Sequence, residues 1–201
     1  MSKRLYAAYG SNLNIQQMAS RCPGAKLYGT GVIENFELQF KGQPHGAFAT
    51  IAPKDGASVP VAVWEISKRN EQALDRYEGY PSHYFKQDVP VQLDGKEVTA
   101  MVYVMNLKMD FGLPAPYYYD VVREGYEDCG LDPAALEQAL RESTAQFYGS
   151  HWPHQESIFR FESDAEPDED ELEEDDDPDL DEDEPELDET DPFYFSEGMH
   201  L

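Results

Sequence analysis

Three short stretches of the sequence carry residues whose types and spacing could support chemistry. The first is YGSN, residues 9–12, where an apolar run stops abruptly in small and polar residues. The second is EG, residues 78–79, and the third is PAPYYY, residues 114–119. The first could bind an anion through backbone N–H groups, the second could supply an acid–base carboxylate, and the third offers phenolic hydroxyls to a polar ligand.

The YGSN stretch lies between a predicted strand and a predicted helix, where several backbone N–H groups lack partners. The helix dipole adds partial positive charge there, which favours a bound carboxylate or phosphate. The alternative is a plain strand-to-helix turn in which Gly10 supplies unusual backbone dihedrals. The stretch is neither a Walker loop nor a dinucleotide fingerprint, because the second glycine and the lysine are missing. It is not a nucleophile elbow, because Leu13 stands where the last glycine belongs.

Glu78 falls at the C-terminal end of a predicted helix that Ser67 caps. A carboxylate there faces the negative end of the helix dipole, and the aromatic neighbours Tyr77, Tyr80 and Tyr84 could desolvate it. Both effects would raise its pKa, as a general base acting near neutral pH requires. The alternative is a solvated glutamate at a frayed helix end.

The tyrosines at 117–119 stand at a helix start, and three in a row cannot all face the core. At least one hydroxyl could therefore reach a ligand, although ordinary amphipathic packing would also explain the pattern. His151 and His154 flank Pro153, which breaks helical spacing, so we expect no metal site and no cofactor.

Among the elements that would position these residues, predicted strands outnumber predicted helices and mostly follow one another. We predict an α+β fold with a mixed or antiparallel sheet, with closure into a barrel as one option. Asn14 to Gln17 has the spacing of a capping box, Gly79 suits a left-handed position after a helix, and Asp94-Gly95 marks a two-residue hairpin. The predicted strands are residues 5–9, 25–33, 36–40, 47–52, 60–66, 84–93 and 96–105, and the predicted helices are residues 15–21, 67–77, 116–129 and 132–148.

Charge divides the chain into a domain at residues 1–160 and an acidic tail at residues 161–201. Asp and Glu make up 20 of the 29 residues from 163 to 191, whereas residues 1–162 carry a net charge of −5. The acidic window cannot bury enough apolar surface to offset its ordering entropy, so we predict a disordered tail. Its FYF segment, residues 193–195, is either a frayed terminus or a docking motif for a basic protein partner.

The opening residues do not form a signal peptide, and no apolar run approaches the length of a membrane span. Two cysteines, Cys22 and Cys129, make neither a disulfide framework nor a metal quartet. We therefore expect a soluble, cytoplasmic protein without membrane contact. The acidic surface argues against binding nucleic acid through its phosphates.

Together the three stretches resemble the γ-glutamylcyclotransferase family, which includes the AIG2-like proteins. The family pattern has an early strand ending in YGSN, then LDxxEG, then PxPxY; here these are residues 9–12, 74–79 and 114–118. The order and approximate spacings agree over about residues 4–148. The run of tyrosines leaves the register of the last motif ambiguous between Tyr117 and Tyr118, and the proline spacing favours Tyr118.

The resemblance implies a compact mixed β-barrel flanked by helices. It also implies an enzyme that acts on a small-molecule γ-glutamyl amide. The α-amino group of the substrate attacks its own γ-carbonyl and releases 5-oxoproline, and Glu78 serves as general acid and base. The residues implied in substrate binding are Tyr6, Ala7, Ala8, Tyr9, Gly10, Ser11, Asn12, Tyr103 and Tyr118.

Two other functions stay open at this point. One is a non-catalytic AIG2-like binding module that acts through its acidic tail. The other is a hydrolase using Ser11, which would need a histidine and an acid in contact with that hydroxyl. The sequence identifies neither the leaving group of the γ-glutamyl substrate nor the oligomeric state.

Overall fold

The computed structural model describes residues 3–106 and 108–151. The predicted acidic tail and its FYF segment lie outside these residues. The strands are β1 (Lys3–Ala8), β2 (Lys26–Gln43), β3 (Gly46–Ser67), β4 (Tyr84–Leu93) and β5 (Lys96–Met105). The helices are the 3₁₀-helix η1 (Ser11–Leu13), α1 (Ile15–Arg21), α2 (Lys68–Glu78), α3 (Pro116–Asp128) and α4 (Ala134–His151).

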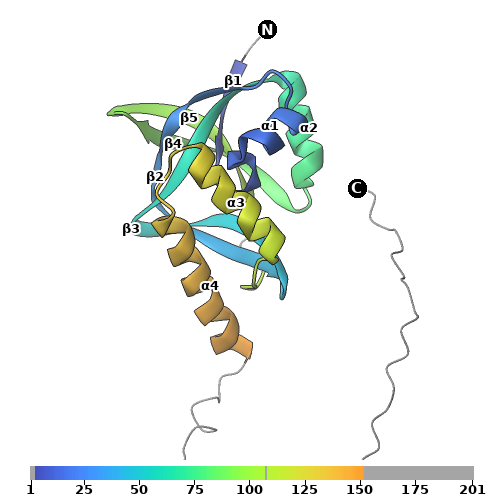
Figure 1. The fold of residues 1–201 in the computed structure, drawn as a ribbon, viewed down its shortest axis with the longest axis vertical. Coiled ribbons are helices and arrows are strands. Elements are labelled where there is room, and N and C mark those ends of the chain that lie inside the picture. The colour runs from blue at the N-terminus through green and yellow to red at the C-terminus, as the bar shows by residue number, and fades with distance from the viewer. Residues whose placement is uncertain (1–2, 107, 152–201) are drawn as a thin grey trace, which may run out of the picture. The chain divides into compact units, whose positions relative to one another are not determined.

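The five strands close into a barrel in the order β1-β3-β2-β4-β5. Four of the strand pairs are antiparallel, and β1 closes the ring by pairing parallel with β5, where Tyr6 faces Met101. The predicted mixed barrel is therefore confirmed. Figure 1 shows α1 and α2 next to each other beside β1, with α3 running across the strands in front of them.

Four of the predicted strands are in fact two long ones, β2 and β3, so that prediction was wrong. A bulge at Asn35 keeps the ladder continuous between residues 33 and 36, where the polar sequence had indicated a break. Asn35 takes a φ of 60°, and its side-chain oxygen accepts a hydrogen bond from the N–H of Gly56 at 3.0 Å. Asparagine tolerates this left-handed conformation, so Asn35 forms a bulge within the β2–β3 ladder and does not end a strand.

Local signals at helix and hairpin ends are mostly confirmed. Ser67 and Asn70 form a reciprocal capping box at the start of α2, and Gly79 ends that helix with a φ of 65°. The side chain of Asn14 accepts from the N–H of Gln17, as predicted. The reciprocal half of that capping box is wrong, because the Gln17 side chain instead accepts from Arg21.

Helices α3 and α4 pack closely on the rest of the fold, α3 on η1 and α4 on the barrel strand β2. Gly125 of α3 lies against η1, where a Cβ on Gly125 would come within 2.5 Å of the Asn14 nitrogen. α4 packs on β2, and the buried hydroxyl of Ser143 accepts from the N–H of Phe40 at 2.9 Å. None of the helices described is both long and apolar enough to span a membrane.

Candidate active site

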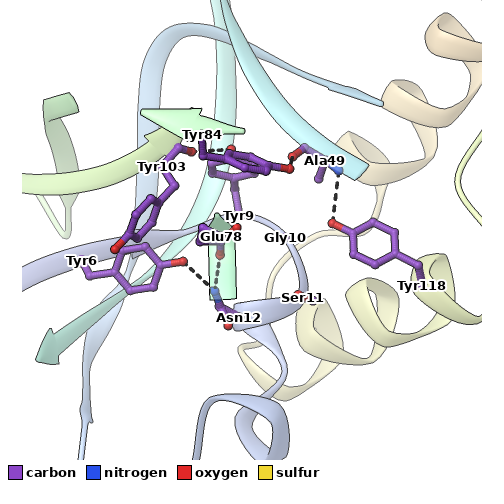
Figure 2. A pocket seen from close by; sticks show the side chains of 10 residues that line it. All are labelled: Tyr6, Tyr9, Gly10, Ser11, Asn12, Ala49, Glu78, Tyr84, Tyr103 and Tyr118. Carbon is purple, nitrogen blue, oxygen red and sulfur yellow. Dashed lines mark hydrogen bonds between the residues drawn. The ribbon is translucent and has the colours of Figure 1, made fainter. Parts of the chain in front are cut away.

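One pocket brings together residues from all three candidate stretches (Figure 2). It opens where β1 ends, beside the end of α2 and the start of α3. The barrel closure produces this meeting, because its residues lie up to 112 positions apart in the sequence. The lining residues are Tyr6, Tyr9, Gly10, Ser11, Asn12, Ala49, Glu78, Tyr84, Tyr103 and Tyr118.

The loop from Gly10 to Asn12 forms one wall of this pocket. Within the described part of the chain, the N–H groups of Ser11 and Asn12 have no hydrogen-bond acceptor. Gly10 has a φ of −115°, so a left-handed backbone is not the reason for a glycine here. The reason is space: a Cβ on Gly10 would lie 3.2 Å from the Tyr118 hydroxyl.

Glu78 is the last residue of α2, and its carboxylate turns toward the loop (Figure 2). The side-chain amide of Asn12 donates to Glu78 Oε1 at 3.0 Å and to the Tyr6 hydroxyl at 2.9 Å. No other side chain among the described residues hydrogen-bonds the carboxylate. One carboxylate oxygen is thus held, while the other is available to a ligand.

Burial raises the pKa of Glu78 from 4.5 to about 7. The charge of Arg21 and the hydrogen bond from Asn12 both lower it, but by less than burial raises it. The sequence had suggested two causes, the helix dipole and desolvation by aromatic neighbours; desolvation is the largest cause. A carboxyl group with such a pKa exchanges protons readily near neutral pH.

Tyrosine side chains make up most of the remaining wall. The Tyr9 hydroxyl donates to the carbonyl of Tyr103 at 2.5 Å, and the Tyr103 hydroxyl donates to Asp75 at 2.7 Å. Burial is the largest cause raising the pKa values of Tyr9 and Tyr103 above the ordinary range. Both phenols therefore stay neutral, and they shape the pocket without adding charge.

Two pocket tyrosines are anchored on a single residue of β3. The carbonyl of Ala49 accepts from the Tyr84 hydroxyl at 3.2 Å, and its N–H donates to the Tyr118 hydroxyl at 3.1 Å. The sequence reasoning named Tyr84 only as a neighbour of Glu78 and missed Ala49 entirely. No local pattern distinguishes this alanine, because its role comes from its two backbone groups.

Some residues predicted for the site lie elsewhere. Ala7 and Ala8 are buried in the barrel core and do not line the pocket. Tyr80 is exposed, under Lys86, rather than against Glu78. Tyr117 points to solvent with 76% of its surface exposed, whereas Tyr118 lines the pocket, as the proline spacing favoured.

The surroundings of Ser11 do not suit a nucleophile. Its hydroxyl lies 3.3 Å from the Tyr77 hydroxyl and accepts from Arg21 at 3.1 Å. Among the residues that the structure describes, no histidine or carboxylate is hydrogen-bonded to it. The base that a nucleophilic serine needs is therefore not paired with this hydroxyl, which argues against the Ser11 hydrolase.

A second cavity of about 220 Å³ adjoins the pocket and shares Glu78 with it. Phe48 and Tyr77 wall this cavity, and each has 49% of its surface exposed. A molecule bound at the loop could therefore extend past Glu78 toward solvent.

The barrel and its pocket define a class of protein: an enzyme whose pocket holds one buried carboxylate among phenols and beside backbone N–H groups that have no acceptor in the described part of the chain. A family model described as gamma-glutamyl cyclotransferase, AIG2-like, matches residues 6–120. This chain belongs to that family.

Individual relatives agree with the family match. A gamma-glutamylcyclotransferase of Bos taurus is 34% identical over 140 residues, covering 63% of this chain and 72% of that protein. The Homo sapiens protein of the same name is 32% identical over 146 residues, covering 68% of this chain and 77% of that one. A solved gamma-glutamyl cyclotransferase superposes with a TM-score of 0.63 at 32% identity, covering 70% of this chain and 87% of its own.

Proposed function

We propose that this protein is a γ-glutamyl cyclotransferase, which converts a γ-glutamyl amide into 5-oxoproline and a free amine or amino acid. The observation that carries the proposal is Glu78, a single pocket carboxylate with a pKa of about 7, beside a loop whose N–H groups have no acceptor among the described residues. The names of the relatives support the same reaction. They favour it over a non-catalytic binding module.

The reaction needs no nucleophile from the protein. The α-amino nitrogen of the substrate attacks its own γ-carbonyl carbon, a five-membered ring closes, and the amide C–N bond breaks. The enzyme gains rate by holding the substrate in a folded, near-attack conformation. This agrees with the contacts of Ser11, whose hydroxyl is hydrogen-bonded to no histidine or carboxylate among the described residues.

Glu78 carries the proton through both steps. The α-amino group is an ammonium ion at neutral pH, so the ionised carboxylate first removes a proton from it. After the neutral amino group has attacked, the protonated carboxyl group gives that proton to the departing nitrogen, which leaves as a neutral amine. The ring nitrogen gives its extra proton to the regenerated carboxylate, which passes it to solvent. One group can serve as base and acid in turn because its pKa lies near the working pH.

The remaining pocket residues bind and orient the γ-glutamyl portion. The N–H groups of Ser11 and Asn12 donate to substrate oxygens, and one of them stabilises the negative charge that develops on the carbonyl oxygen. Tyr6, Tyr103 and Tyr118 enclose the aliphatic chain and supply neutral hydroxyls.

The test is to incubate the purified chain with a panel of γ-glutamyl dipeptides and γ-glutamylamines and to quantify 5-oxoproline and released amine. We expect the two products in equal amounts. The matched control is the same compound acetylated on its α-amino nitrogen, which cannot attack and should release nothing. Release of glutamate instead of 5-oxoproline, or turnover of the acetylated compound, would contradict internal attack.

The activity should depend on pH through Glu78. Only the ionised carboxylate can act as base, so kcat/KM should rise with pH and level off above a pKa of about 7. A solvated glutamate would place this rise near pH 4.5. Initial rates from pH 5 to 9 at low substrate concentration measure it, and a rise centred below pH 5.5 would disprove the buried-base assignment.

Replacing Tyr118 by Phe should lower both stability and turnover. The change leaves the N–H of Ala49 without its acceptor, at a cost of about 1–3 kcal/mol, and removes a hydroxyl from the pocket. Tyr117→Phe is the matched control, because that side chain is exposed. Thermal unfolding and kcat/KM should distinguish the two variants; equal behaviour would place the functional hydroxyl elsewhere.

Three finer statements stay predictions. The leaving group is unidentified, and the cavity beside Phe48 and Tyr77 is where we expect it to lie. Cytoplasmic location, without membrane or nucleic-acid contact, follows from composition alone. Docking of a basic protein partner concerns the acidic tail, which lies outside the described residues.

A further inference from the structure

Arg21 does not line the pocket, yet it forms hydrogen bonds to two residues of the loop that does. It is the last residue of α1. Its Nη1 donates to Asn12 Oδ1 at 2.7 Å and to Ser11 Oγ at 3.1 Å. Arg21 therefore touches two pocket residues from behind.

The guanidinium group is held from two further directions. Its Nη2 donates to Gln17 Oε1 at 2.5 Å, and its central carbon lies 3.8 Å from the centre of the Tyr77 ring. A planar fork of donors stacked on an aromatic ring has one orientation, which a lysine cannot reproduce. The guanidinium group of Arg21 is thus held in one orientation, in which it hydrogen-bonds the loop.

The hydrogen bond from Arg21 determines the orientation of the Asn12 side-chain amide. An asparagine amide has an acceptor oxygen on one side and a donor NH₂ on the other, and the two are similar in shape. Arginine is a donor only, so it takes the oxygen. The NH₂ group must then face Glu78 and Tyr6, as the distances of 3.0 Å and 2.9 Å show.

The opposite orientation would set the Asn12 oxygen against the Glu78 carboxylate. Two acceptors in contact repel each other, and the carboxylate would lose the one hydrogen bond that a described side chain gives it. Arg21 also lowers the pKa of Glu78 by its charge, against the larger effect of burial. The hydrogen bond from Asn12 and the charge of Arg21 both favour the ionised form of Glu78, and the hydrogen bond also fixes the position of its carboxylate.

Apart from Glu78, the titratable residues that line the pocket and the adjoining cavity are tyrosines. They come from several elements: Tyr6 from β1, Tyr9 from the residue that follows it, Tyr77 from α2, Tyr84 from β4, Tyr103 from β5 and Tyr118 from α3. The neutral phenols cannot take over the role of a cation when Arg21 is removed.

We propose that Arg21 is a positioning residue, which fixes the amide of Asn12 so that the Glu78 carboxylate is held ready to accept a proton, without itself touching the substrate. This inference rests on the proposed function of Glu78. It adds to that function a second layer of residues, Arg21 and Gln17, that the pocket lining does not include.

The first experiment compares Arg21→Met with Arg69→Met. Arg69 is an exposed arginine on α2 that has no hydrogen-bond or ion-pair partner among the described residues, so its variant controls for the change of net charge. We expect Arg21→Met to lower kcat by about ten- to a hundred-fold with little change in KM. The rise of kcat/KM with pH should move up by about one unit. Arg69→Met should change neither.

Arg21→Lys separates charge from orientation and serves if the Met variant folds poorly. The lysine restores a positive charge but not the planar fork, so the pH profile should return toward wild type while kcat stays low. A merely structural role predicts the reverse: kcat recovers with thermal stability, and the pH profile never moves. Full recovery of kcat by lysine would overturn the proposal.

A double variant tests the route through Asn12. If Arg21 acts by orienting this amide, Arg21→Met should add little to the loss already caused by Asn12→Ala. Losses that multiply in the double variant would show that Arg21 acts independently of Asn12 and would overturn the proposal.

A readout without turnover separates this inference from the proposed function. The side-chain carboxyl ¹³C resonance of Glu78 reports its protonation directly, and it should titrate at higher pH in Arg21→Met than in wild type. A wild-type chain that forms no 5-oxoproline would refute the proposed function alone. An active wild type with identical titration in both arginine variants would refute the role of Arg21 alone.

Discussion

Glu78→Gln is expected to reduce 5-oxoproline formation by about 10²–10⁴-fold, the contribution typical of a positioned general acid and base. Glutamine has nearly the same shape and can still accept from Asn12, so substrate should still bind. It cannot remove a proton from the α-ammonium group. Single-turnover release of 5-oxoproline measures the loss, and binding of the product by calorimetry checks that the pocket is intact.

Glu137→Gln on α4 is the matched control for this variant. Its carboxylate is exposed and pairs only with Arg141 on the same helix among the described residues, so the same chemical change should leave turnover unaffected. Near-normal activity in Glu78→Gln would remove Glu78 from the mechanism. Loss of product binding together with turnover would assign it a binding role instead.

The same variant should change how stability depends on pH. Wild-type Glu78 has a pKa of about 7 in the folded protein and an ordinary value of 4.5, so its contribution to stability is complete below pH 4.5 and is lost as the pH rises through 7. Glutamine stays neutral and loses nothing. The unfolding free energy of Glu78→Gln should therefore exceed that of wild type above pH 7, by an amount on the order of 3 kcal/mol.

Gly125→Ala is expected to be damaging although it lies outside the pocket. The new Cβ would lie 2.5 Å from the Asn14 nitrogen and 2.6 Å from Leu13 Cβ, so backbone must move. We expect a loss of about 1–3 kcal/mol in unfolding free energy. Because the displaced turn begins at Ser11, turnover should fall with it.

Gly149→Ala is the control for this change. It is the same substitution within a helix, but no atom lies within 4 Å of the new Cβ. Alanine is the better helix former, so this variant should be neutral or more stable by about 0.5–1 kcal/mol. Chemical denaturation of both variants measures the difference. A Gly125→Ala variant as stable and active as wild type would show that α3 can move away from the turn without consequence.

Features that depend only on residues adjacent in the chain could be predicted from the sequence. Ser67 and Gly79 bound α2, and Asp94-Gly95 turns the last hairpin, because caps and two-residue turns depend on adjacent residues only. Asn35 shows the limit of such signals. It has the residue type of a turn, and only the paired strand across from it decides that it is a bulge.

The residues of the candidate site also form two groups: those in local motifs, which could be predicted, and those that only folding brings together. Glu78 and the loop at residues 10–12 lie in motifs whose order along the chain could be recognised. Ala49, by contrast, meets Tyr84 and Tyr118 across 35 and 69 positions, and it does so through backbone groups that every residue has. Arg21 was equally hidden, since its partners depend on how α1 turns back over the loop. These contacts exist only once the barrel has closed.

The hydrogen bond from Phe40 to Ser143 shows that the folded unit extends beyond the residues that the family model matches. The family match ends at residue 120, yet the buried N–H of Phe40 finds its acceptor on α4, beyond that limit. A fragment cut where the family match ends would remove this acceptor and uncover the strand that α4 packs against. Fragments for expression should therefore be bounded by the contacts of β2 and extend through α4.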